Sequence, residues 1–156
     1  MRKKLQSIIS QLKVAEYDEL KSVLGVRDQT LRKNLEELLK ERAILLIEDK
    51  FIPGPNIEAE ERYDLKELNL EKREIDWNKV SKVVFKELKE EIKELKDDIK
   101  LLNQEPKKLE LRYFDLSIKY HEFYRYFYNN YKTDFLTPLL EELKECREML
   151  NKFEYE

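Results

Sequence analysis

Apolar and polar residues between positions 2 and 42 follow the spacing of short amphipathic helices. In the first such stretch the apolar positions fall on one helix face, namely Leu5, Ile8, Ile9 and Leu12. Two further stretches repeat the pattern, and Gly25 stands between them, where a glycine suits the left-handed end of a helix. The pattern predicts helices over residues 2–13, 16–24 and 28–42.

The helical spacing ends at residue 43. Residues 43–48 are rich in isoleucine and leucine, which predicts a strand, and residues 49–50 suit a tight turn before a return strand at 51–52. Residues 53–55, Pro-Gly-Pro, then end regular structure. Residues 56–74 begin with an acidic run and are expected to form a linker, with a short helix near 57–68.

A different pattern begins near residue 76, where apolar residues recur at alternating intervals of three and four. This spacing is typical of helices that pack along a heptad seam. The first seam comprises Phe85, Leu88, Ile92, Leu95, Ile99 and Leu102. Pro106 must interrupt that helix, because proline has no N–H and clashes with the preceding turn.

Two further seams follow the interruption. The second comprises Leu109, Tyr113, Leu116, Tyr120, Phe123 and Phe127. Thr137 and Pro138 suit the start of another helix, since proline is favoured in the first turn. The third seam comprises Leu139, Leu143, Cys146, Leu150 and Phe153. Three helices joined by short breaks predict an antiparallel helical hairpin or a three-helix coiled coil.

The fold class expected from these patterns is mainly α-helical in two parts. An N-terminal domain covers residues 1–55, a linker covers 56–74, and an antiparallel helical coiled-coil region covers 75–156. Composition agrees, because 42% of the residues are charged and only 2 glycines occur in 156 positions. The net charge of −3 divides into +2 for residues 1–55 and −5 for the rest. This asymmetry favours a nucleic-acid-binding module at the N-terminus.

The stretch from Tyr17 to Leu35 carries the features of a helix-turn-helix. Leu20, Val26 and Leu31 can hold the two helices at a steep angle, and Gly25 supplies the turn. With the strand pair that follows, residues 5–53 resemble the winged helix-turn-helix family of bacterial and archaeal transcription regulators. The resemblance covers roughly a third of the chain. It implies sequence-specific binding of double-stranded DNA by a transcriptional regulator.

The resemblance further implies that the third helix lies in the DNA major groove. The residues expected to face DNA are Arg27, Asp28, Gln29, Thr30, Arg32, Lys33 and Asn34. Arginine can bind guanine through two hydrogen bonds, and glutamine or asparagine can bind adenine likewise, while lysine and threonine suit phosphate oxygens. The predicted wing departs from the family pattern, because Asp49 is acidic and only Lys50 can contact the DNA backbone.

Two alternatives to a regulator remain open at this point. The poorly charged wing and the acidic C-terminal part also fit a scaffold protein, in which the winged helix and the coiled coil contact other proteins. A DNA-binding replication or maintenance protein of a plasmid or virus is the other alternative. Salt dependence of DNA binding separates the scaffold from both DNA-binding functions.

Ten aromatic residues fall between positions 113 and 135. This exceeds what one helix seam requires and predicts a homodimer contact. The expected dimer residues are Tyr113, Tyr120, Phe123, Tyr124, Phe127 and Tyr131. A stacking platform for single-stranded nucleic acid, an aromatic ligand pocket and a core within one chain are the alternatives. A dimer would join two DNA-binding modules and favour a palindromic site.

The sequence shows no constellation that suggests catalysis, a cofactor or a metal site, so the protein is not expected to be an enzyme. His121 is the single histidine and is expected at a surface or interface, whereas Cys146 lies on a seam as a small apolar residue. Nothing in the sequence identifies a small-molecule effector. One cysteine and the lack of a membrane span or signal-peptide core favour a cytoplasmic protein.

Overall fold

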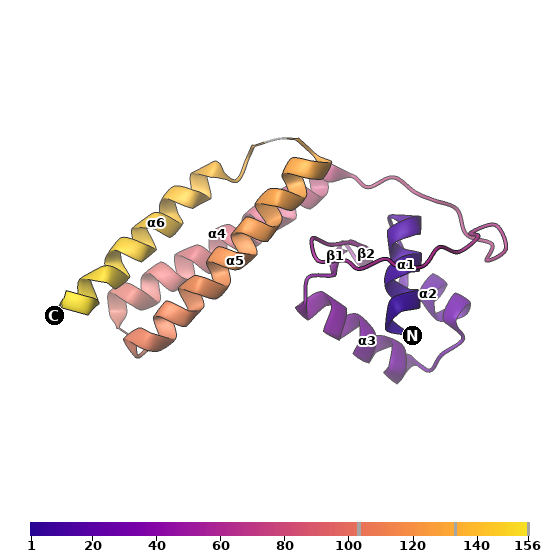
Figure 1. Ribbon diagram of the computed structural model, residues 1–156, viewed down its shortest axis with the longest axis horizontal. Coiled ribbons are helices and arrows are strands. Elements are labelled where there is room, and N and C mark those ends of the chain that lie inside the picture. The colour runs from indigo at the N-terminus through magenta and orange to yellow at the C-terminus, as the bar shows by residue number, and fades with distance from the viewer. Residues whose placement is uncertain (103, 133, 156) are drawn as a thin grey trace. The chain divides into compact units, whose positions relative to one another are not determined.

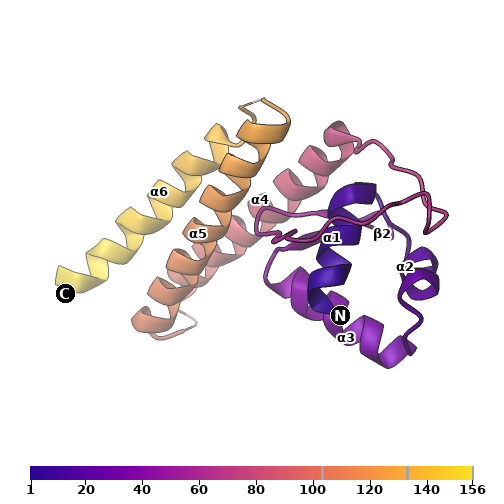
Figure 2. The ribbon, with the colours of Figure 1, turned by 45° about the vertical axis from the view of Figure 1, so that its right-hand side comes forward.

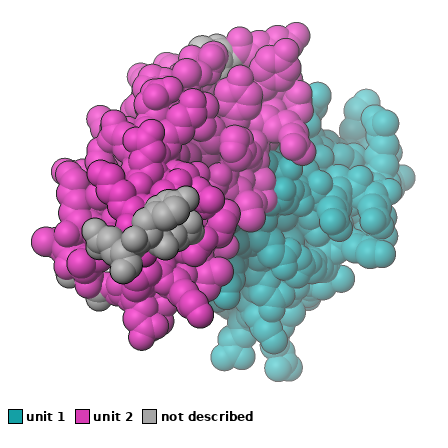
Figure 3. Space-filling model, turned by 60° about the vertical axis from the view of Figure 1, so that its left-hand side comes forward, with its two compact units in different colours: residues 1–77 teal, residues 78–156 magenta. Residues whose placement is uncertain are grey.

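The computed structural model describes residues 1–102, 104–132 and 134–155. Six α-helices and one two-stranded antiparallel sheet make up the regular structure of these residues, so the expectation of a mainly helical chain is confirmed. The chain forms two compact units, Met1–Trp77 and Asn78–Glu156, which are coloured separately in Figure 3. Each unit has its own apolar core.

Three short helices begin the first unit: α1 (Arg2–Leu12), α2 (Tyr17–Leu24) and α3 (Asp28–Lys40). The apolar face predicted for α1 is fully buried, because Leu5, Ile8, Ile9 and Leu12 are all 0% exposed. α2 starts with a capping box, in which the side chains of Glu16 and Glu19 each accept a backbone N–H of the first turn. Buried residues of these helices form one core. The three helices lie together in the indigo and purple part of the ribbon (Figure 1).

A β-hairpin follows α3 and consists of β1 (Ile44–Ile47) and β2 (Lys50–Pro53). The turn lies one residue earlier than the predicted positions 49–50. Glu48 and Asp49 form the turn, and Lys50 already pairs with Ile47 in the sheet. Both turn residues adopt positive φ, 50° and 66°, as a two-residue turn between twisted strands requires. Figure 2 shows the hairpin and the helices of this unit from a second direction.

The hairpin also pairs with the loop between α1 and α2. Ala15 N–H donates to the Phe51 carbonyl at 2.9 Å, and Phe51 N–H donates to the Ala15 carbonyl at 2.8 Å. This isolated antiparallel bridge ties β2 to the end of α1. The hairpin is therefore part of the first unit's core, to which Ile44 and Phe51 contribute their side chains.

Residues 56–74 form a strap across the first unit in place of the predicted linker. The expected helix near 57–68 is absent from these residues, which contain only turns and extended chain. The strap instead contributes apolar side chains to the core, namely Ile57, Tyr63, Leu65, Leu68 and Leu70. The first compact unit therefore extends well beyond residue 55, because the core of the short helices is incomplete without the strap.

Polar side chains of α1 hold the first part of the strap. The N–H of Glu58 donates to Gln6 Oε1 at 2.9 Å, and the N–H of Glu61 donates to Ser7 Oγ at 3.2 Å. Gln11 both accepts from the N–H of Tyr63 and donates to its carbonyl, each at 2.7 Å. An extended segment has no internal hydrogen bonds, so these side chains satisfy its backbone.

Three long helices make up the second unit: α4 (Trp77–Leu101), α5 (Pro106–Asn130) and α6 (Thr137–Asn151), with a final 3₁₀ turn at Lys152–Tyr155. The predicted interruption lies between α4, which ends at Leu101, and Pro106, which is the first residue of α5, where its missing N–H costs nothing. The α4 seam differs from the prediction at both ends. Val84 is buried in place of Phe85, and Leu102 lies beyond the helix with φ 54° and 57% exposure.

The three helices pack against one another with alternating direction. Arg112, near the start of α5, donates to Asp98 near the end of α4 at 2.7 Å, so these two helices are antiparallel. Arg147, near the end of α6, lies 5.6 Å from the ring centre of Tyr113, so α5 and α6 are antiparallel as well. The result is a small bundle of three helices (Figures 1 and 2), and most residues of their seams are buried.

Candidate nucleic-acid interface

A short turn sets the direction of α3 relative to α2. Gly25 adopts φ 60°, and its N–H donates to the Lys21 carbonyl at 2.9 Å, which ends α2. A residue with a side chain is strained in this left-handed conformation, so glycine suits it. Arg27 is extended, with φ −70° and ψ 151°, and α3 starts at Asp28.

The apolar residues of the predicted helix-turn-helix lie behind α3. Leu20 of α2 and Leu31 of α3 are both 0% exposed, and Val26 from the turn packs partly buried against the same core. Leu35 and Leu38 continue the buried face of α3. Because this face is fully occupied, the opposite side of α3 is exposed to solvent.

Gln29 and Lys33 lie at the centre of that exposed side. They are four residues apart, so both lie on the face opposite Leu31 and Leu35. Arg27 and Thr30 are exposed beside them. Six of the eight residues expected at DNA are therefore exposed in the N-terminal half of α3 or directly before it, namely Arg27, Asp28, Gln29, Thr30, Arg32 and Lys33.

Asp28 has a structural role within the first unit. The Tyr17 hydroxyl donates to its carboxylate at 2.8 Å, and Lys21 lies 3.0 Å away. The hydrogen bond from Tyr17, together with Lys21, lowers the pKa of Asp28 below its ordinary value. Asp28 therefore connects α3 to α2. Its carboxylate already has partners within the unit, which argues against the base-reading role predicted for it.

Two more predicted DNA contacts also have partners within the chain. The guanidinium of Arg32 lies 5.8 Å from the ring centre of Tyr17, a cation–π distance. The amide of Asn34 donates to the Thr30 carbonyl one turn earlier at 2.7 Å. Arg32 keeps its positive charge for a phosphate, whereas Asn34 has used one of its two donors along its own helix.

Two carboxylates near the end of α3 have a cationic partner on α1. Arg2 of α1 lies 3.7 Å from Glu37, in the C-terminal half of α3, and forms a second ion pair with Glu41, directly after the helix. In the described ranges, Arg27, Arg32 and Lys33 form no ion pair with a carboxylate. The N-terminal half of α3 thus presents cations, and the negative charge near its other end is partly neutralised.

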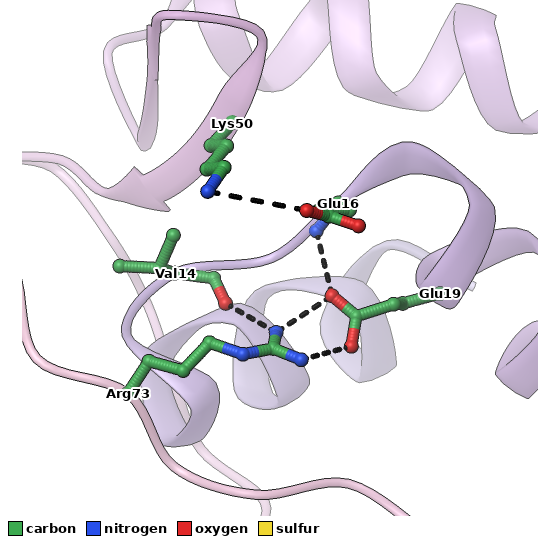
Figure 4. A network of polar contacts seen from close by, with 5 residues as sticks. All are labelled: Val14, Glu16, Glu19, Lys50 and Arg73. Atoms are coloured by element: carbon green, nitrogen blue, oxygen red, sulfur yellow. Dashed lines mark hydrogen bonds and ion pairs between the residues drawn. The ribbon is translucent and has the colours of Figure 1, made fainter.

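The hairpin offers less positive charge than the prediction assigned to it. Lys50 lies 3.9 Å from Glu16 at the start of α2, as Figure 4 shows, and the turn itself is Glu48 and Asp49. The lysine is thereby held near the helix pair, beside an acidic turn. Its contribution to binding a polyanion is weakened by that carboxylate.

Arg73 closes the same polar network from the end of the strap. Its guanidinium forms a two-pronged ion pair with Glu19 and donates to the Val14 carbonyl at 2.9 Å (Figure 4). The hydrogen bond from Arg73 lowers the pKa of Glu19, and the same bond raises the pKa of Arg73. Sequence reasoning missed this pair because 54 positions separate its members.

Several residues predicted for a dimer contact lie in the core of the second unit. Tyr120, Phe123 and Phe127 are 1%, 2% and 1% exposed, so the prediction that they meet a second chain is wrong for this folded state. The Tyr120 hydroxyl donates to the Leu136 carbonyl at 2.9 Å, and burial raises its pKa to about 12. A seam predicts an apolar face but does not identify its partner, and here the partner is the same chain.

The other predicted dimer residues are more accessible. Tyr124 is 39% exposed, while Tyr113 and Tyr131 are half-buried at opposite ends of α5. Their rings contact neighbours of the same unit, since Tyr124 stacks on Tyr120 and Tyr131 meets Phe135 edge-on. The six residues therefore do not form one continuous exposed surface.

Other chemistry in the described residues is sparse. Cys146 is buried, and desolvation raises the pKa of its thiol to about 11, which disfavours the reactive thiolate. His121 is exposed, in agreement with its predicted surface position. Across the described ranges, no three potential ligands from His, Cys, Asp and Glu gather into a metal site. None of the helices described combines the length and apolar character that a membrane span requires.

Comparison of the chain with protein-family models, with curated proteins and with solved structures finds no match.

Proposed function

We propose that the first unit binds duplex DNA with α3 in the major groove, as winged helix-turn-helix proteins do. Support comes from the order of its elements, which is α1, α2, a three-residue connection, α3 and an antiparallel hairpin. The bridge between Ala15 and Phe51 adds to this support, because it attaches the hairpin beside the helix pair. Leu20, Val26 and Leu31 share one core behind α3, as such a helix pair requires.

The observation that carries the proposal is the unpaired positive charge at the start of α3. Arg2, Lys21 and Lys50 each have a carboxylate partner in the same unit. Arg27 and Lys33, both exposed, have none among the described residues. Cations that are left for an external partner suit phosphate, and the positive end of the helix dipole adds to this attraction.

The contacts of α3 divide its residues between two functions. We assign base reading to Gln29 and Lys33, since they project furthest from the core and suit adenine and guanine edges. Arg27, Thr30 and Arg32 flank them and would contact the sugar-phosphate backbone. Asp28 and Asn34 then serve mainly to position α3, because their side chains already bond within the unit.

Binding of this kind fits a transcriptional regulator that recognises a specific sequence. A protein that binds DNA for plasmid or viral replication or maintenance would use the same surface. The assignment of base-reading residues is common to both functions, so one binding experiment tests them together.

Fluorescence anisotropy with a labelled random-sequence duplex at several salt concentrations tests the proposal. The full chain should bind with a strong linear dependence of log K on log salt concentration. Arg27→Ala should reduce that slope by about one, because one phosphate contact is lost. On a duplex selected from random sequences for tight binding, Gln29→Ala should weaken the binding free energy by about 1–3 kcal/mol. The same change should relax the sequence preference of the protein.

Lys89→Ala provides the matched control. Lys89 is also an exposed helical cation, but it lies on α4 in the second unit. Its removal should leave the affinity and the salt slope unchanged. Equal losses in Arg27→Ala and Lys89→Ala would show only a general charge effect and would count against α3 as the binding element.

The hairpin supports a second candidate function, in which the first unit binds protein. Its turn is acidic, and its one lysine lies 3.9 Å from Glu16, so it offers little to a phosphate backbone. A scaffold of this kind would show weak DNA binding without a salt slope. That outcome would replace the DNA proposal with a search for a protein partner of α3.

A further inference from the structure

α5 carries a row of exposed apolar side chains on the face opposite its buried seam. Leu111, Phe114 and Ile118 are 64%, 43% and 55% exposed. Their spacing of three and four residues places them side by side along the helix. Tyr128, 68% exposed, continues the row about three turns further on. These four residues are called the outer row.

Charged residues also lie along the outer row, among them Arg125 on its line and Asp115 at its edge. Arg125 lies seven residues after Ile118 and therefore on the same line, while Asp115 follows Phe114 directly. Both side chains are exposed, and neither forms an ion pair with a described residue. They lie ten residues apart, about 15 Å along the helix, which is too far for them to pair with each other.

The inward-facing charges of α5 differ from these two. Arg112 donates to Asp98 at 2.7 Å, and Lys119 donates to Glu91 at 2.6 Å, so both bind carboxylates of α4. The bundle thus uses the charges on the inner flank of α5. Asp115 and Arg125 form no ion pair with a described residue, so these two charges are available to a partner outside the unit.

A second α5 in the opposite direction matches the outer row. Positions 115 and 125 are equally distant from residue 120. A two-fold axis near that residue therefore brings each Arg125 opposite the Asp115 of the second copy. Leu111 also comes near Tyr128, while the ring of Phe114 keeps the cation–π contact at 5.5 Å that it already makes with Arg147 of α6. A parallel pair would instead place each Arg125 beside the other Arg125, which is repulsive.

We propose that a second copy of this chain docks on the outer row of α5 in antiparallel orientation, around a two-fold axis near residue 120. The row extends from residue 111 to 128, about 26 Å of helix, and its apolar side chains lose water on docking. One helix face is a small interface, so the association is reversible and depends on concentration. The dimer expected from the sequence is thus retained, but its contacts move from the buried seam to the outer row.

Sedimentation equilibrium of the full chain without DNA tests the proposal. The wild type should shift from monomer to dimer as its concentration rises. The double change Phe114→Lys and Ile118→Lys should abolish the dimer. The matched control is Leu101→Lys and Leu102→Lys, which adds the same charge at two exposed leucines at the end of α4. This control should dimerise like the wild type.

Circular dichroism confirms that each variant remains folded, as expected for changes at exposed positions. A wild type that stays monomeric at every concentration would overturn the proposal. Dimerisation that persists in the Phe114 and Ile118 double variant would do so as well, because the contact would then lie elsewhere.

A charge exchange tests the antiparallel register. Asp115→Arg alone or Arg125→Asp alone should weaken the dimer about tenfold, since each places like charges opposite each other twice. The two changes together should restore it. A combined variant as weak as either single variant would rule out this register. The measurement contains no DNA, so its failure leaves the DNA proposal standing, and a failure to bind DNA leaves the dimer standing.

Discussion

The two compact units have nearly equal lengths, but their cores are built differently. The first unit, Met1–Trp77, assembles short helices, a hairpin and the strap, so that Leu5 and Leu70 belong to one core. The second unit, Asn78–Glu156, buries rows of residues from three long helices. Two units of similar length therefore differ in that one has a core of distant segments and the other a core of periodic rows.

The polar contacts of the two units also differ, because one core includes an extended strap and the other consists of helices. In the first unit, Gln6 and Ser7 are buried and bind the backbone of the strap. In the second unit, the buried Ser81 bonds the Asn78 carbonyl of its own helix. Within the described residues, no buried side-chain nitrogen or oxygen lacks a hydrogen-bond partner. A helix satisfies its own backbone, whereas an extended strap requires polar side chains from elsewhere.

This comparison implies that the second unit is most sensitive to the loss of apolar volume. The first unit should respond more strongly to the loss of a single polar contact or to backbone strain. Three substitutions test this difference, in order of decreasing expected effect.

The largest effect is expected from Phe127→Ala in the second unit. Phe127 is 1% exposed, and its ring lies 4.8 Å from Phe135 and 5.2 Å from Tyr126 between ring centres. Its truncation leaves a cavity and should reduce the free energy of unfolding by about 3–5 kcal/mol. Urea denaturation followed by circular dichroism measures this change.

Leu101→Ala is the control for that measurement. Leu101 is 68% exposed at the end of α4, so its truncation should change the free energy of unfolding by less than about 0.5 kcal/mol. Similar losses in the two variants would contradict a core built on the buried seam of α5.

A smaller effect is expected from Glu19→Gln in the first unit. Gln keeps the shape but removes the charge that binds Arg73, which should reduce the free energy of unfolding by about 1 kcal/mol at neutral pH. The folded chain lowers the pKa of Glu19 from its ordinary 4.5. The carboxylate therefore stabilises the fold above that value, and this contribution disappears as the pH falls through the lowered pKa.

Thermal unfolding of the wild type and Glu19→Gln across a pH series checks this prediction. The two proteins should differ at neutral pH and converge in acid. Glu141→Gln removes a carboxylate from an exposed pair with Lys144 at 3.6 Å and should have almost no effect at either pH. A constant difference between wild type and Glu19→Gln at all pH values would argue against the ion pair as its cause.

The smallest effect is expected from Asp49→Gly, and it is stabilising. Asp49 adopts φ 66° in the two-residue turn of the hairpin, a conformation that glycine adopts without strain. The change should raise the free energy of unfolding of the first unit by about 0.5 kcal/mol, since relief of strain exceeds the added entropy of the unfolded chain. Asp18→Gly, in the first turn of α2, should destabilise by comparison, because glycine is a poor helix former. Equal destabilisation of both would contradict the left-handed turn.

The sequence by itself determined the helices, the hairpin and most of the faces they bury, although it also predicted a helix near 57–68 that does not form. The spacing of Leu5, Ile8, Ile9 and Leu12 specified a buried helix face, and Gly25 and Pro106 marked helix boundaries. These features depend on residues within a few positions of one another, so local periodicity and backbone preference are sufficient to reveal them. The exposed N-terminal half of α3 was predictable for the same reason.

Only the tertiary structure decided which partner each side chain meets. It placed the strap on α1, joined Glu19 to Arg73, and attached Asp28 to Tyr17. It also buried Phe127 in the core of the same chain and left the outer row of α5 exposed. Such pairings depend on chain segments that come together only on folding, and the spacing of residues within one helix contains no information about them.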